Sequence, residues 1–369
     1  MHAGFSERDR QHMGRALALA ERGATTTHPN PRVGCVIVRD EETVGEGWHE
    51  WAGEPHAEIA ALRAAGAAAR GATAYVTLEP CSHHGRTPPC VNALIEAGVA
   101  RVVFAIEDPN PRVRGAGAEA LRHAGIGVAS GLMAQEAADL NAGFFTRMKH
   151  GRPWVRLKLA MSLDGRTALA NGASRWISSE AAREDVQHWR ARSSAVLTGI
   201  GTVLADDPRL SVRLPSVRAR PPLRVILDTA LRTPPTARLL DENGPVWIFT
   251  ASENAGRRQA LEARGARVER LEGAGRPSLP QVLTRLAAAE INELLVEAGA
   301  TLAGELIRTQ LVDELLLYVA PILLGPQGRA LVTLPELTEL AQSPRFEIIE
   351  TRPIGVDVRL RLRPVPGDR

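Results

Sequence analysis

Apolar and polar positions in the first 150 residues alternate between two periods, one typical of helices and the other typical of strands. Amphipathic segments predict helices in residues 8–23, 55–71, 87–100 and the first part of 115–132. Short apolar runs predict strands in residues 33–40, 43–50, 71–80, 101–109 and the end of 115–132. Because strands alternate with helices, this part of the chain predicts a layered α/β domain.

A polar stretch with glycine and proline, residues 149–153, interrupts this pattern before a second alternating region begins. Strands are predicted from residue 154 to about 160 and in residues 193–201, 222–228, 245–250, 293–299 and 313–325. Helices are predicted in residues 179–193, 254–265 and 278–290. The chain therefore divides into two expected α/β domains, residues 1–150 and 151–369.

The composition is that of an ordinary globular protein, and it narrows the classes of function. The net charge is only +3, which does not indicate a polyanion-binding surface. No apolar run reaches about 18 residues, so we expect no membrane span. The first residues lack the apolar core of a signal peptide, and three cysteines are an odd number that suits a reducing compartment. We therefore expect a cytoplasmic protein.

Residues able to bind a metal or to transfer protons are concentrated in the first domain, which holds all three cysteines and nine of the ten histidines. His56 opens a predicted helix, and Glu58 follows two residues later. Cys81 ends a predicted strand, and Cys90 lies in the first turn of the next helix. One imidazole and two thiolates suit a catalytic zinc, which keeps a fourth position for water. Glu58 is placed to move a proton from that water to a departing amine, as in zinc-dependent nucleobase deaminases.

Other interpretations of these residues stay open at this point. A structural zinc normally has four closed protein ligands, and an intracellular cysteine is often a core residue, as we expect for Cys35. A zinc-stapled binding module would not need Glu58. A nucleic-acid-editing deaminase would need a basic groove with aromatic residues, which the small net charge and the two tyrosines do not favour.

Eight residues separate Cys81 from Cys90, where the usual zinc-deaminase motif has two. The longer loop offers substrate contacts. Arg86 suits a phosphate, and His83 suits a sugar or a phosphate. A solvated loop is the alternative, above all for His84.

The chain closely resembles the deaminase half of the bacterial bifunctional riboflavin-biosynthesis deaminase/reductase family in three segments, HPNPRVGCVIV, GEPHAEIAAL and LEPCSHHGRTPPC. The eight-residue gap is itself a feature of that family. The resemblance implies that Zn²⁺ is bound by His56, Cys81 and Cys90. It also implies that Glu58 shuttles protons and that the pyrimidine or its sugar contacts Asn30 and His49. The implied fold is a cytidine-deaminase-like α/β/α sandwich.

The second domain has no Gly-x-Gly-x-x-Gly motif at its start, so the Rossmann fingerprint is absent. Its strand at 293–299 leads instead into small residues and a helix, where backbone N–H groups can approach a pyrophosphate. Two further segments, KLAMSLDGRTALANGASRWIS and TGIGTVLADDPRLSVR, closely resemble the reductase half of the same family, which has a dihydrofolate-reductase-like fold. The resemblance is weak from about residue 273 to 289 and over the last forty residues.

The resemblance implies a set of contacts in the second domain. For NADPH these are Ala160, Trp176, Thr202, Asp206, Gly299, Ala300, Thr301, Leu302, Ala303 and Gly304. For the substrate they are Ser174, Arg190, Leu210, Arg213 and Glu297. Arg190 and Arg213 suit the substrate phosphate, because a guanidinium binds phosphate oxygens bidentately. Asp206 is either an acid or a cap or turn residue, and both interpretations stay open.

Lys158 stands out because this chain has only one other lysine, Lys149. We hypothesise that Lys158 orients the substrate or polarises the opening sugar, with a surface-edge lysine as the alternative. We expect the first domain to deaminate 2,5-diamino-6-(ribosylamino)pyrimidinone 5′-phosphate and the second to reduce the ribosyl group to ribityl with NADPH. We expect no nucleic-acid or membrane partner, and a homo-oligomer that is a dimer or a tetramer.

Overall fold

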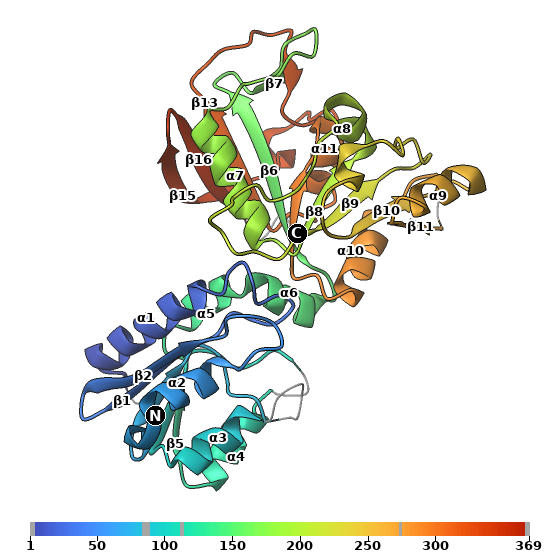
Figure 1. Cartoon of the computed structure of the whole chain (residues 1–369). Coiled ribbons are helices and arrows are strands. Elements are labelled where there is room, and N and C mark those ends of the chain that lie inside the picture. The colour runs from blue at the N-terminus through green and yellow to red at the C-terminus, as the bar shows by residue number, and fades with distance from the viewer. Residues whose placement is uncertain (1–3, 83–88, 111–113, 273–274, 366–369) are drawn as a thin grey trace. The chain divides into compact units, whose positions relative to one another are not determined.

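The computed structural model describes residues 4–82, 89–110, 114–272 and 275–365. The chain forms two compact units, Met1–Gly151 and Arg152–Arg369 (Figure 1). The boundary thus follows residue 151, where the sequence pattern placed it after residue 150. No helix among the described residues has the length and apolar character that a membrane span requires.

The first unit is built on a mixed sheet whose strands follow the order β2-β1-β3-β4-β5. β1 is antiparallel to β2 and β3, whereas β3, β4 and β5 run parallel to one another. The strands are β1 (Gly34–Arg39), β2 (Glu42–Trp48), β3 (Thr73–Val76), β4 (Arg101–Phe104) and β5 (Gly127–Ser130).

Helices cover both faces of this sheet. They are α1 (Glu7–Glu21), α2 (Ala57–Ala65), α3 (Cys90–Ala97), α4 (Ala116–His123), α5 (Ala134–Leu140) and α6 (Ala142–His150). Successive residues of β1 face opposite sides, as the pleat requires. Ile37 packs in a cluster with residues of α2, α3 and α4, whereas Val36 packs with Met13 of α1 and Ala137 of α5. The sheet therefore lies between two helical layers, which confirms the predicted α/β/α sandwich.

The second unit contains a larger sheet in the order β11-β10-β9-β8-β12-β6-β13-β16-β15. Its strands are parallel from β11 to β13, and β16 and β15 continue the sheet as an antiparallel hairpin. The strands are β6 (Trp154–Ser162), β8 (Ala195–Gly199), β9 (Leu223–Leu227), β10 (Val246–Thr250), β11 (Ala266–Arg270), β12 (Glu293–Glu297), β13 (Glu314–Ala320), β15 (Phe346–Ile354) and β16 (Asp357–Pro364). Two short strands, β7 (Arg166–Ala168) and β14 (Arg329–Ala330), pair separately.

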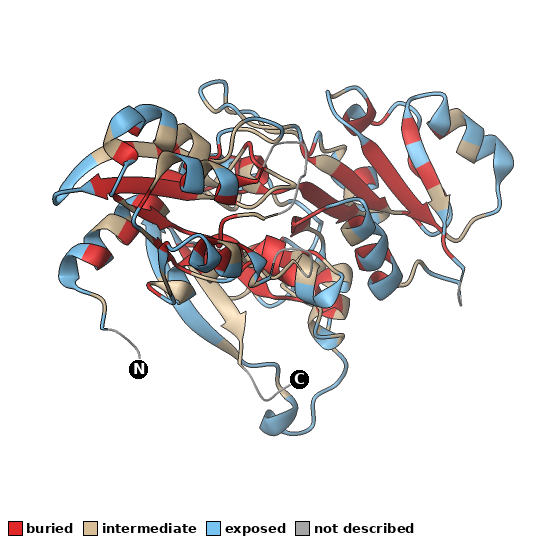
Figure 2. Cartoon of the chain, turned by 90° about the horizontal axis from the view of Figure 1, so that it is seen from below, coloured by how far each residue is buried: buried red, intermediate tan, exposed pale blue. Residues whose placement is uncertain are grey.

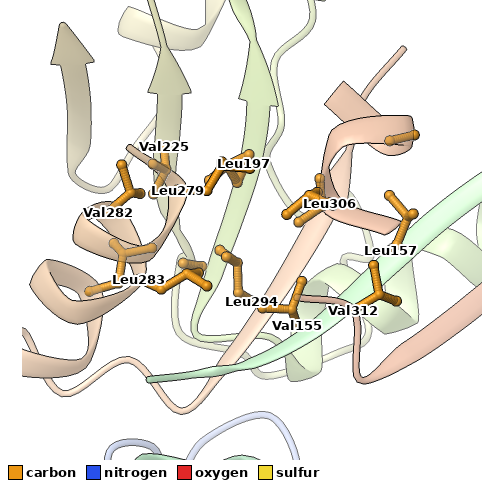
Figure 3. Packing of buried hydrophobic residues seen from close by; sticks show 14 of the residues in the cluster. Val155, Leu157, Leu197, Val225, Leu279, Val282, Leu283, Leu294, Leu306 and Val312 are labelled. Carbon is orange, nitrogen blue, oxygen red and sulfur yellow. The ribbon is translucent and has the colours of Figure 1, made fainter. Parts of the chain in front are cut away.

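The helices of the second unit also form a layer on each face of the sheet. They are α7 (Glu180–Arg192), α8 (Ile200–Asp206), α9 (Ala255–Glu262), α10 (Leu279–Ala288) and α11 (Ala300–Arg308). Figure 3 shows one layer, in which Leu157 and Leu294 of the sheet pack with Leu283 of α10 and Leu306 of α11. On the opposite face, α7 packs against β13, and α8 and α9 pack farther along the sheet. Figure 2 shows central strands of the sheets as buried.

Some of the predicted boundaries were wrong, for local reasons. Lys149 and His150 were expected in the interdomain break, but they are the last two residues of α6. Gly151, with a φ of 63°, is the C-cap of this helix. The residue after β8, Ile200, begins a helix rather than continuing the strand. The sequence pattern did not predict the hairpin β15–β16. Few residues of these two strands are buried, so apolar and polar residues alternate only weakly along them.

Candidate active sites

Three side chains of the first unit converge at the ends of separate elements. His56 is the N-cap of α2, Cys90 is the first residue of α3, and Cys81 follows β3. Their ligand atoms all lie within 4.8 Å of one another. His56 Nδ1 is 3.1 Å from Cys90 Sγ and 3.6 Å from Cys81 Sγ. The structure thus brings together the three residues that the sequence singled out as metal ligands.

The donor set fits a zinc ion. Tetrahedral zinc, with Zn–S of about 2.3 Å and Zn–N of about 2.0 Å, sets its ligand atoms roughly 3.5–3.8 Å apart. The separations of 3.1 and 3.6 Å are close to that spacing. The backbone N–H of Cys90, at the start of a helix, donates to Cys81 Sγ over 3.3 Å. Hydrogen bonding from the Cys90 side chain and from His56 lowers the pKa of Cys81 to about 4, which favours the thiolate form.

Glu58 lies in the first turn of α2, two residues after His56. Its side chain is buried, with 3% of the residue exposed. Burial raises the pKa of Glu58 to about 6. A carboxyl group that titrates near neutral pH can both accept and donate a proton, which is the property that a proton shuttle needs.

Asn30 and His49 lie beside this cluster. The His49 ring is 5.4 Å from the His56 ring, in an edge-to-face arrangement. His49 Nδ1 is 3.1 Å from the carbonyl oxygen of Pro55, so it donates, and Nε2 then accepts from Asn30 Nδ2 at 3.0 Å. Burial lowers the pKa of His49, which favours this neutral form. Both residues are therefore held next to the three candidate metal ligands, and their contact with the substrate stays a prediction.

Glu79 is a buried residue to which the sequence analysis gave no role. Its carboxylate accepts hydrogen bonds from the backbone N–H groups of Asp108, Gly115 and Ala118. These bonds tie the segment that carries Cys81 to the start of α4. The sequence did offer a signal for this role, because Glu79 is an acidic residue near the end of a predicted strand, directly before Pro80. His83 and Arg86 lie outside the described residues.

Two helix starts meet at one edge of the second unit's sheet. β8 and β12 are neighbours, and Gly199 and Gly299 are the N-caps of the helices that follow them. Open α/β sheets bind ligands beyond the carboxyl ends of their parallel strands, which is where these two helix starts lie. A Cβ atom added at Gly299 would meet nothing within 4 Å, so the backbone is accessible there. Ala300, Thr301, Leu302 and Thr202 lie in the first turns of these helices.

Two residues expected to contact NADPH are enclosed by protein packing. Ala303 is fully buried in the hydrophobic core. A Cβ atom at Gly304 would lie 1.9 Å from the carbonyl oxygen of Thr333, so this glycine allows close packing of two chain segments. The accessible part of the expected 299–304 stretch is therefore its beginning.

Lys158 lies in β6, in the interior of the sheet, which rules out the surface-edge alternative. Its register partner on β12 is Glu297. The carboxylate of Glu297 forms a bidentate pair with Arg190 of α7, at 2.6 and 2.9 Å. Burial raises the pKa of Glu297, but Arg190 and Lys158 lower it below its ordinary value. Burial also lowers the pKa of Lys158.

The other expected contacts of the second unit differ in accessibility. Arg190 is buried and held by Glu297, whereas Arg213 is exposed and is the more accessible of the two expected phosphate ligands. Leu210 is buried with a φ of 54°. The remaining four contacts are half-buried or exposed: Ala160, Ser174, Trp176 and Asp206. Asp206 ends α8 and is 3.6 Å from Arg175, while Asp207 is the residue that caps the helix.

Two family models match the chain. The cytidine and deoxycytidylate deaminase zinc-binding region matches residues 6–106, and the RibD C-terminal domain matches residues 153–360. The riboflavin biosynthesis protein RibD of Escherichia coli is 52% identical over 96% of this chain and 99% of its own length. RibD of Haemophilus influenzae is 48% identical over 98% of both chains.

Solved structures agree with these matches. RibD of Acinetobacter baumannii superimposes with a TM-score of 0.90 and 47% identity, covering 97% of this chain and 99% of that chain. A diaminohydroxyphosphoribosylaminopyrimidine deaminase/5-amino-6-(5-phosphoribosylamino)uracil reductase from Thermotoga maritima has a TM-score of 0.85 and 35% identity. It covers 97% of this chain and 99% of that chain.

Proposed function

Because this chain belongs to the RibD family of bifunctional riboflavin-biosynthesis deaminases and reductases, we propose that its two sites act in turn on one phosphorylated pyrimidine. The first site removes the exocyclic amine of 2,5-diamino-6-(ribosylamino)-4(3H)-pyrimidinone 5′-phosphate. The second reduces the ribosyl group of the product and gives 5-amino-6-(ribitylamino)uracil 5′-phosphate. The observation that supports the deaminase step most directly is the cluster of His56, Cys81 and Cys90 near the buried Glu58.

In the deaminase site, His56, Cys81 and Cys90 are the proposed zinc ligands. Zinc, when bound, lowers the pKa of a water molecule towards neutrality. Glu58 takes a proton from that water and passes it to the departing amine, so that a C–O bond replaces the C–N bond and ammonia leaves. Asn30 and His49 hold the pyrimidine or its sugar next to these groups, and His83 and Arg86 are proposed contacts from the intervening loop.

In the reductase site, the helix starts at Gly199 and Gly299 are the proposed cradle for the cofactor phosphates, and Gly299 has open space beside its backbone. NADPH, when bound, supplies a hydride to C1′ of the sugar. Hydride transfer to C1′ would break the C1′–O4′ bond, and the ring oxygen would take up a proton from water. Lys158 is the proposed cation beside that oxygen. Glu297 orients the sugar and stays ionised through its pair with Arg190, and the exposed Arg213 binds the phosphate. Ser174 and Leu210 complete the proposed substrate contacts.

We also propose that NADPH contacts Ala160, Trp176, Thr202, Asp206 and the stretch from Gly299 to Leu302. For Ala303 and Gly304 the proposal is limited to packing, since both are buried. The chain's three cysteines are free, and bound zinc needs reduced thiols, which supports a cytoplasmic location. A homo-oligomer, dimer or tetramer, remains our proposal, and sedimentation of the purified protein tests it.

One assay tests the proposed function directly. Purified protein is mixed with the diaminopyrimidine substrate and NADPH, and ammonia release and the loss of cofactor absorbance are followed separately. We expect ammonia to appear without cofactor, and NADPH to be consumed only after deamination or when the deaminated product is supplied. Consumption of NADPH without prior ammonia release would contradict the proposed order.

A further inference from the structure

The ammonium group of Lys158 has an unusual set of neighbours. Among the described residues, its Nζ forms no hydrogen bond or ion pair, so its donors are available for a ligand. Glu297 of β12 attracts it through space and Arg190 of α7 repels it. The remaining contact is the aromatic face of Tyr318 on β13, whose ring centre is 5.6 Å from Nζ. A cation within about 6 Å of an aromatic ring centre is attracted by its negative face.

The ring of Tyr318 is itself firmly anchored. Tyr318 is 1% exposed, and its hydroxyl group donates to Asp185 Oδ2 over 2.5 Å. The Asp185 carboxylate also accepts two hydrogen bonds from Arg359 Nη1, at 2.9 and 2.8 Å. Trp189 Nε1 donates to the same carboxylate over 3.3 Å. Groups on α7 and β16 therefore fix the orientation of a ring on β13.

Sheet register brings this ring to the reductase site. Lys158 pairs with Leu316 on β13, and Tyr318 pairs with Ala160 on β6. Since side chains two residues apart on a strand share a face, Lys158 and Tyr318 lie on the same side of the sheet. That side is the one covered by α7, where Trp189 and Val186 pack with Tyr318.

We propose that Tyr318 is a positioning residue for the reductase reaction, whose ring face holds the Lys158 ammonium in place for the sugar oxygen. The hydroxyl group acts only by fixing the ring, through Asp185 and Arg359. This inference rests on the proposed role of Lys158. If Tyr318 only filled core volume, its replacement would change reductase turnover by the same factor whether or not Lys158 is present.

Four variants test the proposal: Tyr318→Leu, Tyr318→Phe, Lys158→Met and the double variant Lys158→Met/Tyr318→Leu. Reductase turnover is measured on the deaminated substrate at saturating NADPH. Tyr318→Leu removes the ring face and should lower kcat roughly 3- to 30-fold with little change in the KM for NADPH. Tyr318→Phe keeps the face and should retain kcat within about 2-fold. In the Lys158→Met background, Tyr318→Leu should have no further effect, because the cation is already gone.

The pH dependence of reductase kcat is a second measurement, and it would not change if Tyr318 had only a structural role. Lys158 must be protonated to act as a cation, so reductase activity falls as pH rises through its pKa. Loss of the ring face destabilises the ammonium and lowers that pKa. The basic limb of the kcat profile should therefore move to lower pH in Tyr318→Leu, by up to about one pH unit, and not in Tyr318→Phe.

A matched control is Leu317→Ala, which removes a buried side chain from the opposite face of the same strand. It should lower the thermal stability of the second unit without moving the pH profile. Ammonia release should be unchanged in all variants and reports that the first unit is folded, while a cooperative thermal transition of the second unit reports that the altered unit is folded. If Tyr318→Leu does not fold, Tyr318→Met removes the ring face with a longer, flexible side chain that fills more of the core, and it should lower kcat only where Lys158 is present.

The outcomes separate the inference from its premise. Equal losses from Tyr318→Leu with and without Lys158 would overturn the positioning role while leaving the role of Lys158 intact. Full reductase activity in Lys158→Met would overturn both. Absence of reductase turnover in the unaltered, correctly folded protein would instead contradict the proposed function.

Discussion

Two buried glutamates, one in each unit, illustrate how differently the two sites are built. Glu58 lies among metal-ligating residues, and burial raises its pKa to about 6. Glu297 is also largely buried, yet its pKa is lowered because Arg190 and Lys158 outweigh burial. Burial without a fixed cation favours the protonated acid, whereas burial with one favours the carboxylate. The first arrangement suits a group that moves protons, and the second suits a group that orients and holds charge.

The sites also differ in how the chain assembles them. The proposed zinc ligands lie within residues 56–90. His56 and Cys90 are fixed by helix starts, and Cys81 lies in the segment that follows β3. The reductase groups Lys158, Arg190, Glu297 and Tyr318 come from four elements, and Arg190 and Glu297 are 107 residues apart. Local capping geometry positions the first site, and sheet register positions the second. Substitutions should therefore separate the two activities cleanly.

The largest expected effect is on proton transfer. Glu58→Gln keeps the size of the side chain but removes the carboxyl group, and it should lower ammonia release roughly 10²- to 10⁴-fold. Zinc content and reductase turnover on the deaminated product should stay at the level of the unaltered protein. Ammonia release at an undiminished rate would show that Glu58 is not the proton shuttle.

The next effect tests the charge balance around Glu297. Glu297→Met leaves Arg190 buried without its partner and should destabilise the second unit by about 3 kcal/mol in urea unfolding. The double variant Arg190→Met/Glu297→Met removes both charges and should recover most of that loss. If the single and double variants unfold at the same urea concentration, the loss of stability does not come from leaving Arg190 buried without its partner. The transition of the first unit, followed separately, serves as the control.

A smaller effect concerns acid stability in the first unit. Burial would raise the pKa of Asp9, but hydrogen bonds from Ser6 and Tyr75 and the nearby Arg101 lower it to about 2. Because the pKa of Asp9 in the folded protein lies below the ordinary aspartate value of 3.8, this contribution is present above about pH 4 and is lost as pH falls towards 2. Asp9→Asn should lower the free energy of unfolding of the first unit by about 1–2 kcal/mol at neutral pH. The fall of this free energy between about pH 4 and pH 2 should also become less steep. An unchanged acid limb would contradict this account.

The same contrast explains what the sequence could predict. The zinc cluster, the helix starts and the α/β layering follow from local patterns, so the structure matches them closely. The pairing of Arg190 with Glu297 was not predictable, because it depends on register between distant elements. The close packing of Gly304 depends on Thr333, a residue 29 positions away in the sequence, which gives no local signal. The hairpin β15–β16 was missed because much of it is exposed.

We infer that one unit holds a zinc-dependent deaminase and that the reductase in the other unit works without zinc. The most direct measurement is the rate of each reaction before and after a chelator removes the metal from the full-length protein, with metal content determined in parallel. We predict that ammonia release is lost with zinc and restored by adding Zn²⁺, while NADPH consumption on the deaminated product continues. Undiminished ammonia release from metal-free protein would contradict the account.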